Sequence, residues 1–212
     1  MAVKVVMTGF EPFGGDAVNE SWEAVRRLAA EPGALPPDVE LVTALLPVTF
    51  VGAPSALAAL VAAHRPDVVV ATGLAAGTDA VRLERVAVNV ADARIPDNDG
   101  TQPVDVPVVP GAPTAYLSGL PLKAALVELR AAGLPAVVSN TAGTYVCNAV
   151  FYALAHALAQ APGVVGGFVH VPRADALPVA DAARALGVVA SVAVRAARGE
   201  LPEVAVAAGA EH

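Results

Sequence analysis

The feature that most restricts the fold is a continuous apolar run at residues 66–73, which ends in a glycine turn. A strand without polar alternation is typical of a parallel sheet that is covered by helices on both faces. The alternation of strand-like and helix-like segments therefore predicts an α/β fold, a three-layer α/β/α sandwich around a twisted, mostly parallel sheet. The other expected strands are 4–7, 39–46, 86–90, 136–139 and 164–172, and the expected helices are 19–28, 49–64, 121–132, 150–159 and 178–198.

Two segments carry no clear periodicity. Residues 103–113 are punctuated by prolines and are expected to form a loop or an edge strand. Residues 201–212 are expected to be a weakly held tail. No linker, repeat or low-complexity block divides the chain, so residues 1–212 are predicted to form a single domain.

Bulk properties exclude several classes of protein. No window approaches the ~18 consecutive apolar residues of a membrane span, and the N-terminus predicts a strand and not a signal peptide. The single cysteine excludes an internal disulfide framework, and no Cys/His set has zinc spacing. A net charge of −7 without a Lys/Arg run argues against a nucleic-acid partner. We therefore expect a cytoplasmic protein without nucleic-acid or membrane partners.

The single cysteine, Cys147, stands between a strand and a helix. The small residues at 142–144 allow a sharp turn after the strand at 136–139, which places Cys147 in or near the first turn of the following helix. Unpaired N–H groups and the positive end of the helix dipole favour a thiolate there, and hence a nucleophile next to an oxyanion site. The alternative is a small buried apolar residue without chemical function.

A glycine-rich loop at 8–16 follows the first strand. A phosphate site is rejected, because the Gly-Lys-[Ser/Thr] ending is absent and Glu11 and Asp16 would repel an anion. The loop carries two phenylalanines, Phe10 and Phe13. They either pack back on the core or form an apolar slot for a flat ligand.

Candidate partners for Cys147 follow strand ends, where ligands gather in open α/β sheets. Of the four histidines only His170 lies near the carboxyl end of a predicted strand; the others are His64, His156 and the terminal His212. A lone histidine on an apolar strand is often structural, but beside Cys147 it would be a general base. The carboxylate that orients it is open between Glu84, Asp92 and Asp97.

Four segments, in order along nearly the whole chain, resemble the pyroglutamyl peptidase I family, also called pyrrolidone carboxyl peptidases. They are Thr-Gly-Phe-Glu-Pro-Phe-Gly-Gly at 8–15, Glu-Arg-Val-Ala-Val-Asn at 84–89 with Asp-Ala-Arg-Ile-Pro-Asp-Asn at 92–98, Ser-Asn-Thr-Ala-Gly-Thr-Tyr-Val-Cys-Asn at 139–148, and Gly-Gly-Phe-Val-His-Val-Pro at 166–172. The resemblance implies a cysteine peptidase that removes N-terminal pyroglutamate through a thioester intermediate.

The resemblance also implies roles for single residues. Cys147 would be the nucleophile, His170 the base and then the acid, and Glu84 the group that orients His170. The backbone N–H groups of Arg94 and Cys147 are the expected oxyanion hole. The expected substrate-binding residues are Phe10, Phe13 and Asn19. The family resemblance further implies a homotetramer without a metal or cofactor.

Two positions depart from the family pattern. Thr78 stands where members usually carry arginine, and Arg82 stands where they usually carry Ser or Thr. One hypothesis is that Arg82 supplies the charge that Thr78 lacks. Two other functions are weighed against the peptidase: a non-catalytic protein that binds pyroglutamyl or other small ligands, and a nucleoside-phosphorylase-like enzyme that depends on phosphate.

Overall fold

The apolar run forms β3 (Val68–Leu74), an interior strand of a six-stranded sheet with the order β2-β1-β3-β8-β4-β7. The computed structural model describes residues 2–209. Strand β3 pairs in parallel with β1 (Val3–Phe10) and β8 (Val165–Val171), and β2 (Val39–Leu46) pairs in parallel with β1. All but the last residue of β3 are buried, as expected for a strand that helices cover on both faces.

The far side of the sheet runs in the opposite direction. Strand β4 (Val81–Glu84) is antiparallel to β8, and β7 (Ala136–Ser139) is parallel to β4. The carboxyl ends of β4 and β7 therefore point away from the edge at which β1, β3 and β8 end. The prediction that Cys147 meets the other candidates because its preceding strand ends at the same edge as theirs is wrong, since β7 runs in the other direction. Strand β4 itself was not predicted, because four residues are too few to show a period.

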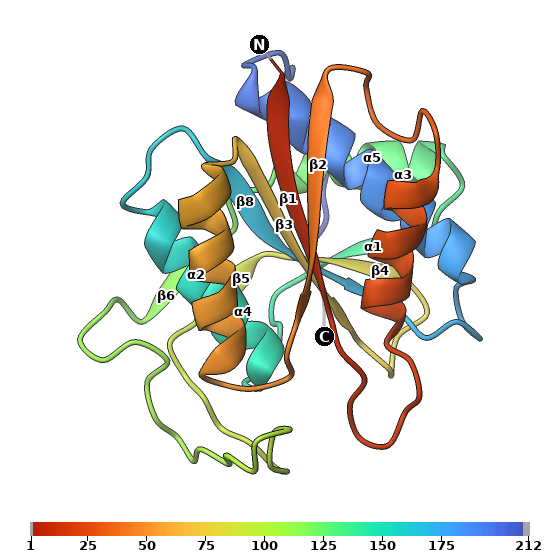
Figure 1. Ribbon diagram of the computed structural model, residues 1–212. Coiled ribbons are helices and arrows are strands. Elements are labelled where there is room, and N and C mark those ends of the chain that lie inside the picture. The colour runs from red at the N-terminus through yellow and green to blue at the C-terminus, as the bar shows by residue number, and fades with distance from the viewer. Residues whose placement is uncertain (1, 210–212) are drawn as a thin grey trace.

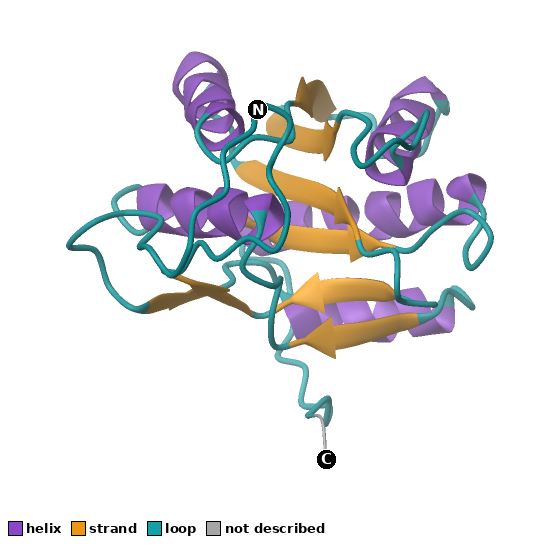
Figure 2. Ribbon diagram, turned by 90° about the horizontal axis from the view of Figure 1, so that it is seen from below, coloured by secondary structure: helices purple, strands orange, loops and turns teal. Residues whose placement is uncertain are grey.

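Helices cover both faces of the sheet, so the predicted α/β/α sandwich is confirmed (Figures 1 and 2). One layer contains α1 (Glu20–Ala30), α3 (Leu122–Ala131) and α5 (Val179–Ala197), and the other contains α2 (Gly52–His64) and α4 (Val146–Leu158). None of the helices described has the length and apolar character that a membrane crossing requires.

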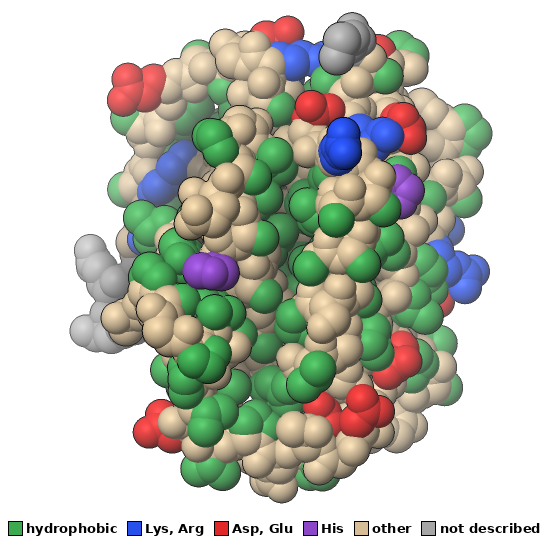
Figure 3. All heavy atoms as spheres, turned by 60° about the vertical axis from the view of Figure 1, so that its left-hand side comes forward, with side chains coloured by type: hydrophobic (Ala, Val, Ile, Leu, Met, Phe, Trp, Pro, Cys, Tyr) green, Lys and Arg blue, Asp and Glu red, His purple; other side chains and the backbone are tan. Residues whose placement is uncertain are grey.

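The outer side of the α2 and α4 layer is poor in charge. Helix α2 contains no Asp, Glu, Lys or Arg. Figure 3 shows this side of the molecule, with few charged side chains in its middle and most of them toward the ends.

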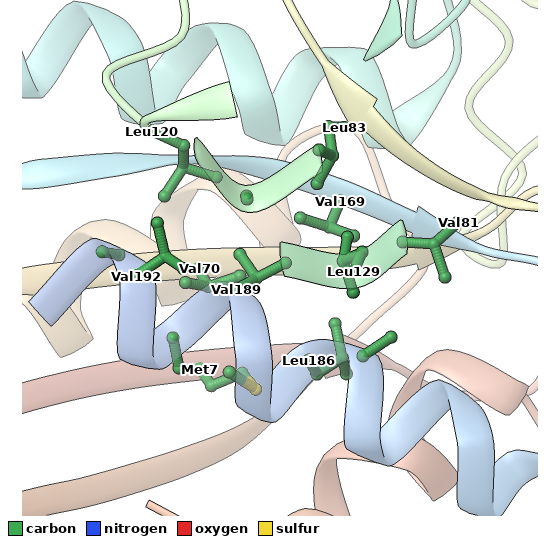
Figure 4. Close-up of a cluster of buried hydrophobic side chains, with 14 of the residues drawn as sticks. Met7, Val70, Val81, Leu83, Leu120, Leu129, Val169, Leu186, Val189 and Val192 are labelled. Atoms are coloured by element: carbon green, nitrogen blue, oxygen red, sulfur yellow. The ribbon is translucent and has the colours of Figure 1, made fainter. Parts of the chain in front are cut away.

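Alternation along β4 separates the core from the candidate site. Val81 and Leu83 are buried in the hydrophobic cluster between the sheet and α5, where they join Val169 of β8 (Figure 4). Arg82 and Glu84 alternate with them and therefore face the α2 and α4 layer. The two polar side chains of β4, a strand too short to be predicted, thus lie on the face that α4 covers.

The remaining segments lie outside the main sheet. Strands β5 (Val86–Val88) and β6 (Ala115–Leu117) form a small antiparallel pair, visible apart from the main sheet in Figure 2. Residues 103–113 form a loop. Its one strand-like pairing among the described residues is the isolated antiparallel β-bridge between Val106 and Ala91. Residues 201–209 have no regular structure, and hydrogen bonds from Lys123 and Arg85 to backbone carbonyls hold them; residues 210–212, including His212, lie outside the described part.

Gly9 tests how closely α1 packs on β1. A Cβ atom at Gly9 would lie 2.6 Å from Cα of Trp22, a backbone atom that cannot move without α1. We expect Gly9→Ala to lower the free energy of unfolding by about 1–3 kcal/mol, measured by chemical denaturation. Gly77→Ala is the control, because a Cβ there meets nothing within 4 Å. Equal stability losses in the two variants would contradict this packing.

Candidate active site

The candidate nucleophile lies in the first turn of α4, as predicted. The chain leaves β7 at Ser139 and turns through Gly143, whose φ of 78° favours glycine. Helix α4 then begins at Val146, so Cys147 is its second residue. Tyr145 occupies the N-cap position and its side chain makes no capping hydrogen bond, so the N–H groups of the first turn receive no side-chain acceptor.

The sulfur of Cys147 lies against the backbone of β3. A Cβ atom at Gly73 would lie 2.8 Å from Sγ of Cys147 and 2.9 Å from the ring of Phe168. Only a residue without a side chain leaves room for the thiol at this point. Gly73 is also the register partner of His170 across the parallel pair of β3 and β8. The close approach thus places the sulfur next to the strand position that carries the histidine.

His170 and Glu84 form a buried pair. Nδ1 of His170 lies 2.9 Å from Oε1 of Glu84, and both side chains are almost completely removed from solvent. They come from neighbouring strands, β8 and β4, on the face that α4 covers. The hydrogen bond on Nδ1 leaves Nε2 as the ring nitrogen that is free to exchange a proton. Histidine and carboxylate thus form a connected pair on the face of the sheet where Cys147 lies against Gly73.

The histidine is held in its charged form. Burial lowers the pKa of His170, but the neighbouring Cys147 sulfur and the Glu84 carboxylate outweigh this effect and raise the pKa to about 9. At neutral pH the ring is therefore an imidazolium. A thiolate beside an imidazolium is a nucleophile with a proton donor already in place.

The structure distinguishes between the three candidate carboxylates. Asp92 is exposed, and its backbone, not its side chain, bonds Thr144. Asp97 is buried but accepts backbone N–H groups, among them that of Phe50 at 2.8 Å. Of the three, Glu84 is the one in contact with His170.

The two other described histidines lie elsewhere. His64 ends α2, and Nδ1 of His156 lies 2.8 Å from the hydroxyl of Tyr116.

An apolar pocket of about 240 Å³ opens beside Cys147. Phe10 is buried at the end of β1 and Phe13 is half-buried in the loop that follows, so both readings of these residues hold: they pack on the core and they line the pocket. The wall also contains a charged pair, in which Arg173 donates to Asp16 at 2.7 Å. Further lining residues are Val18, Asn19, Val48, Leu74, Ala76, Tyr145, Val146 and Cys147.

Tyr145 joins the pocket to the nucleophile. Its ring packs on Phe13 and Phe50, with centroids 5.4 and 5.1 Å away. Burial raises the pKa of Tyr145 to about 12, and the negative charges of Asp97 and Cys147 act in the same direction. The hydroxyl therefore keeps its proton and donates to the carbonyl oxygen of Pro96 at 2.9 Å. This bond holds the 92–97 segment close to the start of α4.

Asn19 lines the pocket while its amide is used locally. Oδ1 accepts from the backbone N–H and the hydroxyl of Ser21, which caps α1, and Nδ2 donates to the carbonyl of Glu11 at 3.0 Å. These bonds fix the loop that carries Phe13 to the start of the helix.

Arg94 is exposed and does not line the pocket. Its segment is nevertheless tied to the turn before Cys147, because the N–H of Asp92 donates to the carbonyl of Thr144 at 3.0 Å and the Thr144 hydroxyl donates to the carbonyl of Asp92 at 2.8 Å. These bonds involve Asp92 and not the N–H of Arg94, so the role of this N–H in an oxyanion hole remains a prediction.

Three residues of the site were not predicted: Gly73 as a contact of the thiol, Tyr145, and Asn148. The buried side chain of Asn148 accepts from the N–H of Val88 and donates to the carbonyls of Val88 and Val90, which anchors β5 to α4. A polar residue directly after Cys147 in an otherwise apolar helix was the available signal. Among residues 2–209 no cluster of His, Cys, Asp and Glu is suited to hold a metal ion.

The chain is similar to known proteins over most of its length. The family model described as "Pyroglutamyl peptidase" matches residues 3–208. A pyrrolidone-carboxylate peptidase of Clavibacter michiganensis is 54% identical over 168 residues, 79% of this chain and 78% of that protein. One of Streptomyces coelicolor is 48% identical over 202 residues, 91% of this chain and 92% of that protein.

Solved structures match as well. The crystal structure of pyroglutamyl peptidase I from Bacillus amyloliquefaciens has a TM-score of 0.84 at 39% identity, covering 90% of this chain and 96% of that one. Pyrrolidone carboxyl peptidase from Pyrococcus furiosus has a TM-score of 0.85 at 37% identity, covering 92% of this chain and 100% of that one.

The contact between Gly73 and the thiol predicts a loss of thiol reactivity in Gly73→Ala. The new Cβ at position 73 would lie 2.8 Å from Sγ of Cys147, which is closer than the two atoms can approach. The sulfur would therefore be displaced from its place beside His170. We expect the rate of alkylation of Cys147 by iodoacetamide to fall on the order of 10–100-fold. Gly77→Ala serves as the control, since its methyl group meets open space. Wild-type reactivity in Gly73→Ala would show that the contact is not required.

The surroundings of His170 predict how its ring titrates. NMR titration of the ring should give a pKa of about 9 in the wild type. In Cys147→Ala the sulfur that raises the pKa is absent while the burial remains, so the pKa of His170 should fall. The same pKa in both proteins would mean that the sulfur does not carry the charge assigned to it.

Proposed function

The chain belongs to the pyroglutamyl peptidase family, and we propose that its activity, the removal of pyroglutamate from the N-terminus of peptides, is carried out by a triad of Cys147, His170 and Glu84. The observation that supports the triad most directly is the buried bond between His170 and Glu84, with the Cys147 sulfur packed against the register partner of His170. The three residues of the triad come from β4, α4 and β8.

The proposed reaction has two stages. The Cys147 thiolate attacks the pyroglutamyl carbonyl carbon and forms a tetrahedral oxyanion. The intermediate collapses to a thioester as the peptide bond breaks, and the imidazolium of His170 gives its proton to the departing amine. Neutral His170 then takes a proton from water, the resulting hydroxide attacks the thioester, and the C–S bond breaks. Pyroglutamate leaves, and the thiolate–imidazolium pair is restored.

We assign the oxyanion hole to the backbone N–H groups of Cys147 and Arg94. The position of Cys147 in the first turn of α4 supports its part, because N–H groups there have no partner within the helix. For Arg94 the support is the attachment of its segment to the turn at Thr144. The loss of one donor from such a site typically lowers kcat on the order of 10²–10³-fold.

The apolar pocket beside Cys147 is proposed to receive the pyroglutamyl ring. The ring is a flat lactam without a charged amine, so it suits a wall of Phe10, Phe13 and Tyr145. Asn19 is proposed as a further binding residue, because it lines the same pocket. Proline lacks the ring carbonyl, so donors that bind this carbonyl would be left unpaired and would discriminate by up to ~10⁴–10⁵-fold.

The setting of the enzyme is also part of the proposal. We propose a single catalytic domain over residues 1–212 that acts in the cytoplasm as a homotetramer, without nucleic-acid or membrane partners and without a metal or cofactor. A free thiol as the single cysteine suits a reducing compartment. The uncharged outer side of α2 supports a subunit interface (Figure 3). Neither a binding protein nor a phosphorylase requires the connected thiol, imidazole and carboxylate.

A chromogenic pyroglutamyl amide tests the activity and the nucleophile together. We expect the wild type to hydrolyse it and to lose activity on alkylation, which has a single target because Cys147 is the sole cysteine. Cys147→Ala should reduce turnover to background, and the matching prolyl amide should not be cleaved. Turnover that survives alkylation contradicts the thiol mechanism, dependence on phosphate would indicate the phosphorylase, and binding without turnover the binding protein.

A further inference from the structure

The side chain of Arg82 bridges two parts of the candidate site. Its Nε lies 3.5 Å from Oε1 of Glu84, the same oxygen that His170 contacts, and its NH2 group donates to the hydroxyl of Ser139 at 2.7 Å. Arg82 is directly opposite His170 in the antiparallel pair of β4 and β8, and it is two residues from Glu84 on the same strand. The three side chains therefore share one face of the sheet.

Glu84 needs more positive charge than His170 alone supplies. Its carboxylate is fully buried, and its second oxygen, Oε2, has no hydrogen-bond partner among the described residues. A buried carboxylate is costly unless a positive group accompanies it. When His170 passes its proton to the leaving amine, it becomes neutral, and Arg82 is then the positive group that still contacts Glu84.

The charged groups around the pair can be named by element. Strand β4 contributes Arg82 and Glu84, β8 contributes His170, and α4 contributes Cys147. Strand β7, which pairs with β4, has no titratable side chain.

Helix α3 packs on the opposite face of β4, and its Arg130 is exposed to solvent. Lys123 bonds the carbonyl of Val206, and Glu128 pairs with Arg195. Among the described residues, Arg82 is therefore the positive group other than His170 that contacts Glu84.

We propose that Arg82 is a positioning residue for catalysis, which keeps Glu84 ionised and oriented while His170 alternates between its charged and neutral forms. This inference rests on the proposed function. The guanidinium suits the task because it remains charged at every working pH and its fork can reach two partners at once.

The bond from Arg82 to Ser139 also connects Glu84 to the segment that leads to Cys147. The hydroxyl of Ser139 accepts from Arg82 and donates to the carbonyl of Thr141 at 3.0 Å. Ser139 ends β7, and the chain turns from there toward Cys147. Arg82 thus ties the carboxylate of the triad to the start of the turn that carries the nucleophile.

The test is the pH dependence of kcat/KM for Arg82→Gln and Arg82→Thr with a pyroglutamyl amide. Both remove the charge, and threonine suits a strand position if glutamine disturbs the fold. Without the competing cation, Glu84 holds the His170 proton more tightly, so the alkaline limb should move to higher pH, on the order of one pH unit. We expect kcat to fall roughly tenfold, the size typical for the loss of a supporting partner, with little change in KM.

Two further variants separate charge from structure. Arg82→Lys keeps the charge but not the fork, so its alkaline limb should match the wild type while kcat recovers only in part. Arg85→Gln removes a neighbouring charge whose guanidinium bonds the carbonyl of Ala208, and it should leave the profile unchanged.

The outcomes divide cleanly. The role of Arg82 is overturned if the alkaline limb of Arg82→Gln and Arg82→Thr stays at its wild-type position. It is also overturned if the limb of Arg82→Lys moves as far as that of Arg82→Gln. An inactive wild type would instead contradict the proposed function.

Discussion

The site depends on the burial of one negative charge. Glu84 lies completely inside the protein, where a carboxylate is stable only with positive partners, and His170 meets it at 2.9 Å. The same contact fixes which ring nitrogen of His170 faces the thiol. Because β4 is antiparallel to β8, the carboxylate and the imidazole reach each other across adjacent strands and need no loop to bring them together. The rigidity of the pair is therefore that of the sheet.

The thiol is placed by backbone geometry. Helix α4 brings Cys147 to β3 at Gly73, where the absence of a side chain lets the sulfur lie against the strand. Gly73 and His170 are register partners, so this packing contact brings the sulfur next to the strand position of His170. The register of β3 with β8 and the position at which α4 begins are both fixed by extensive packing, so neither can shift without the other. This explains how two residues that are far apart in sequence can lie close together.

The loops around the pocket are held by polar side chains that bond to backbone. The buried side chains of Asn148 and Asp97 bind β5 and the N–H of Phe50, and the half-buried Glu11 accepts the N–H of Val48. Each of these side chains satisfies backbone groups that no helix or sheet pairs. The pocket wall can thus be irregular in shape and still be well fixed, which a ligand site of this size requires.

The sequence by itself determined the sandwich of helices and sheet, most element boundaries, the position of Cys147 in the first turn of a helix and the apolar character of the Phe10 and Phe13 loop, because these follow from periodicity and local turn chemistry. It left three carboxylates open, and the family resemblance selected Glu84. Only the tertiary structure decided the direction of β4 and β7, the contact of Gly73 with the thiol and the bridge from Arg82 to Glu84 and Ser139. A four-residue strand has too few residues to show its period, and its direction is set by its partners in the sheet, which local sequence does not specify.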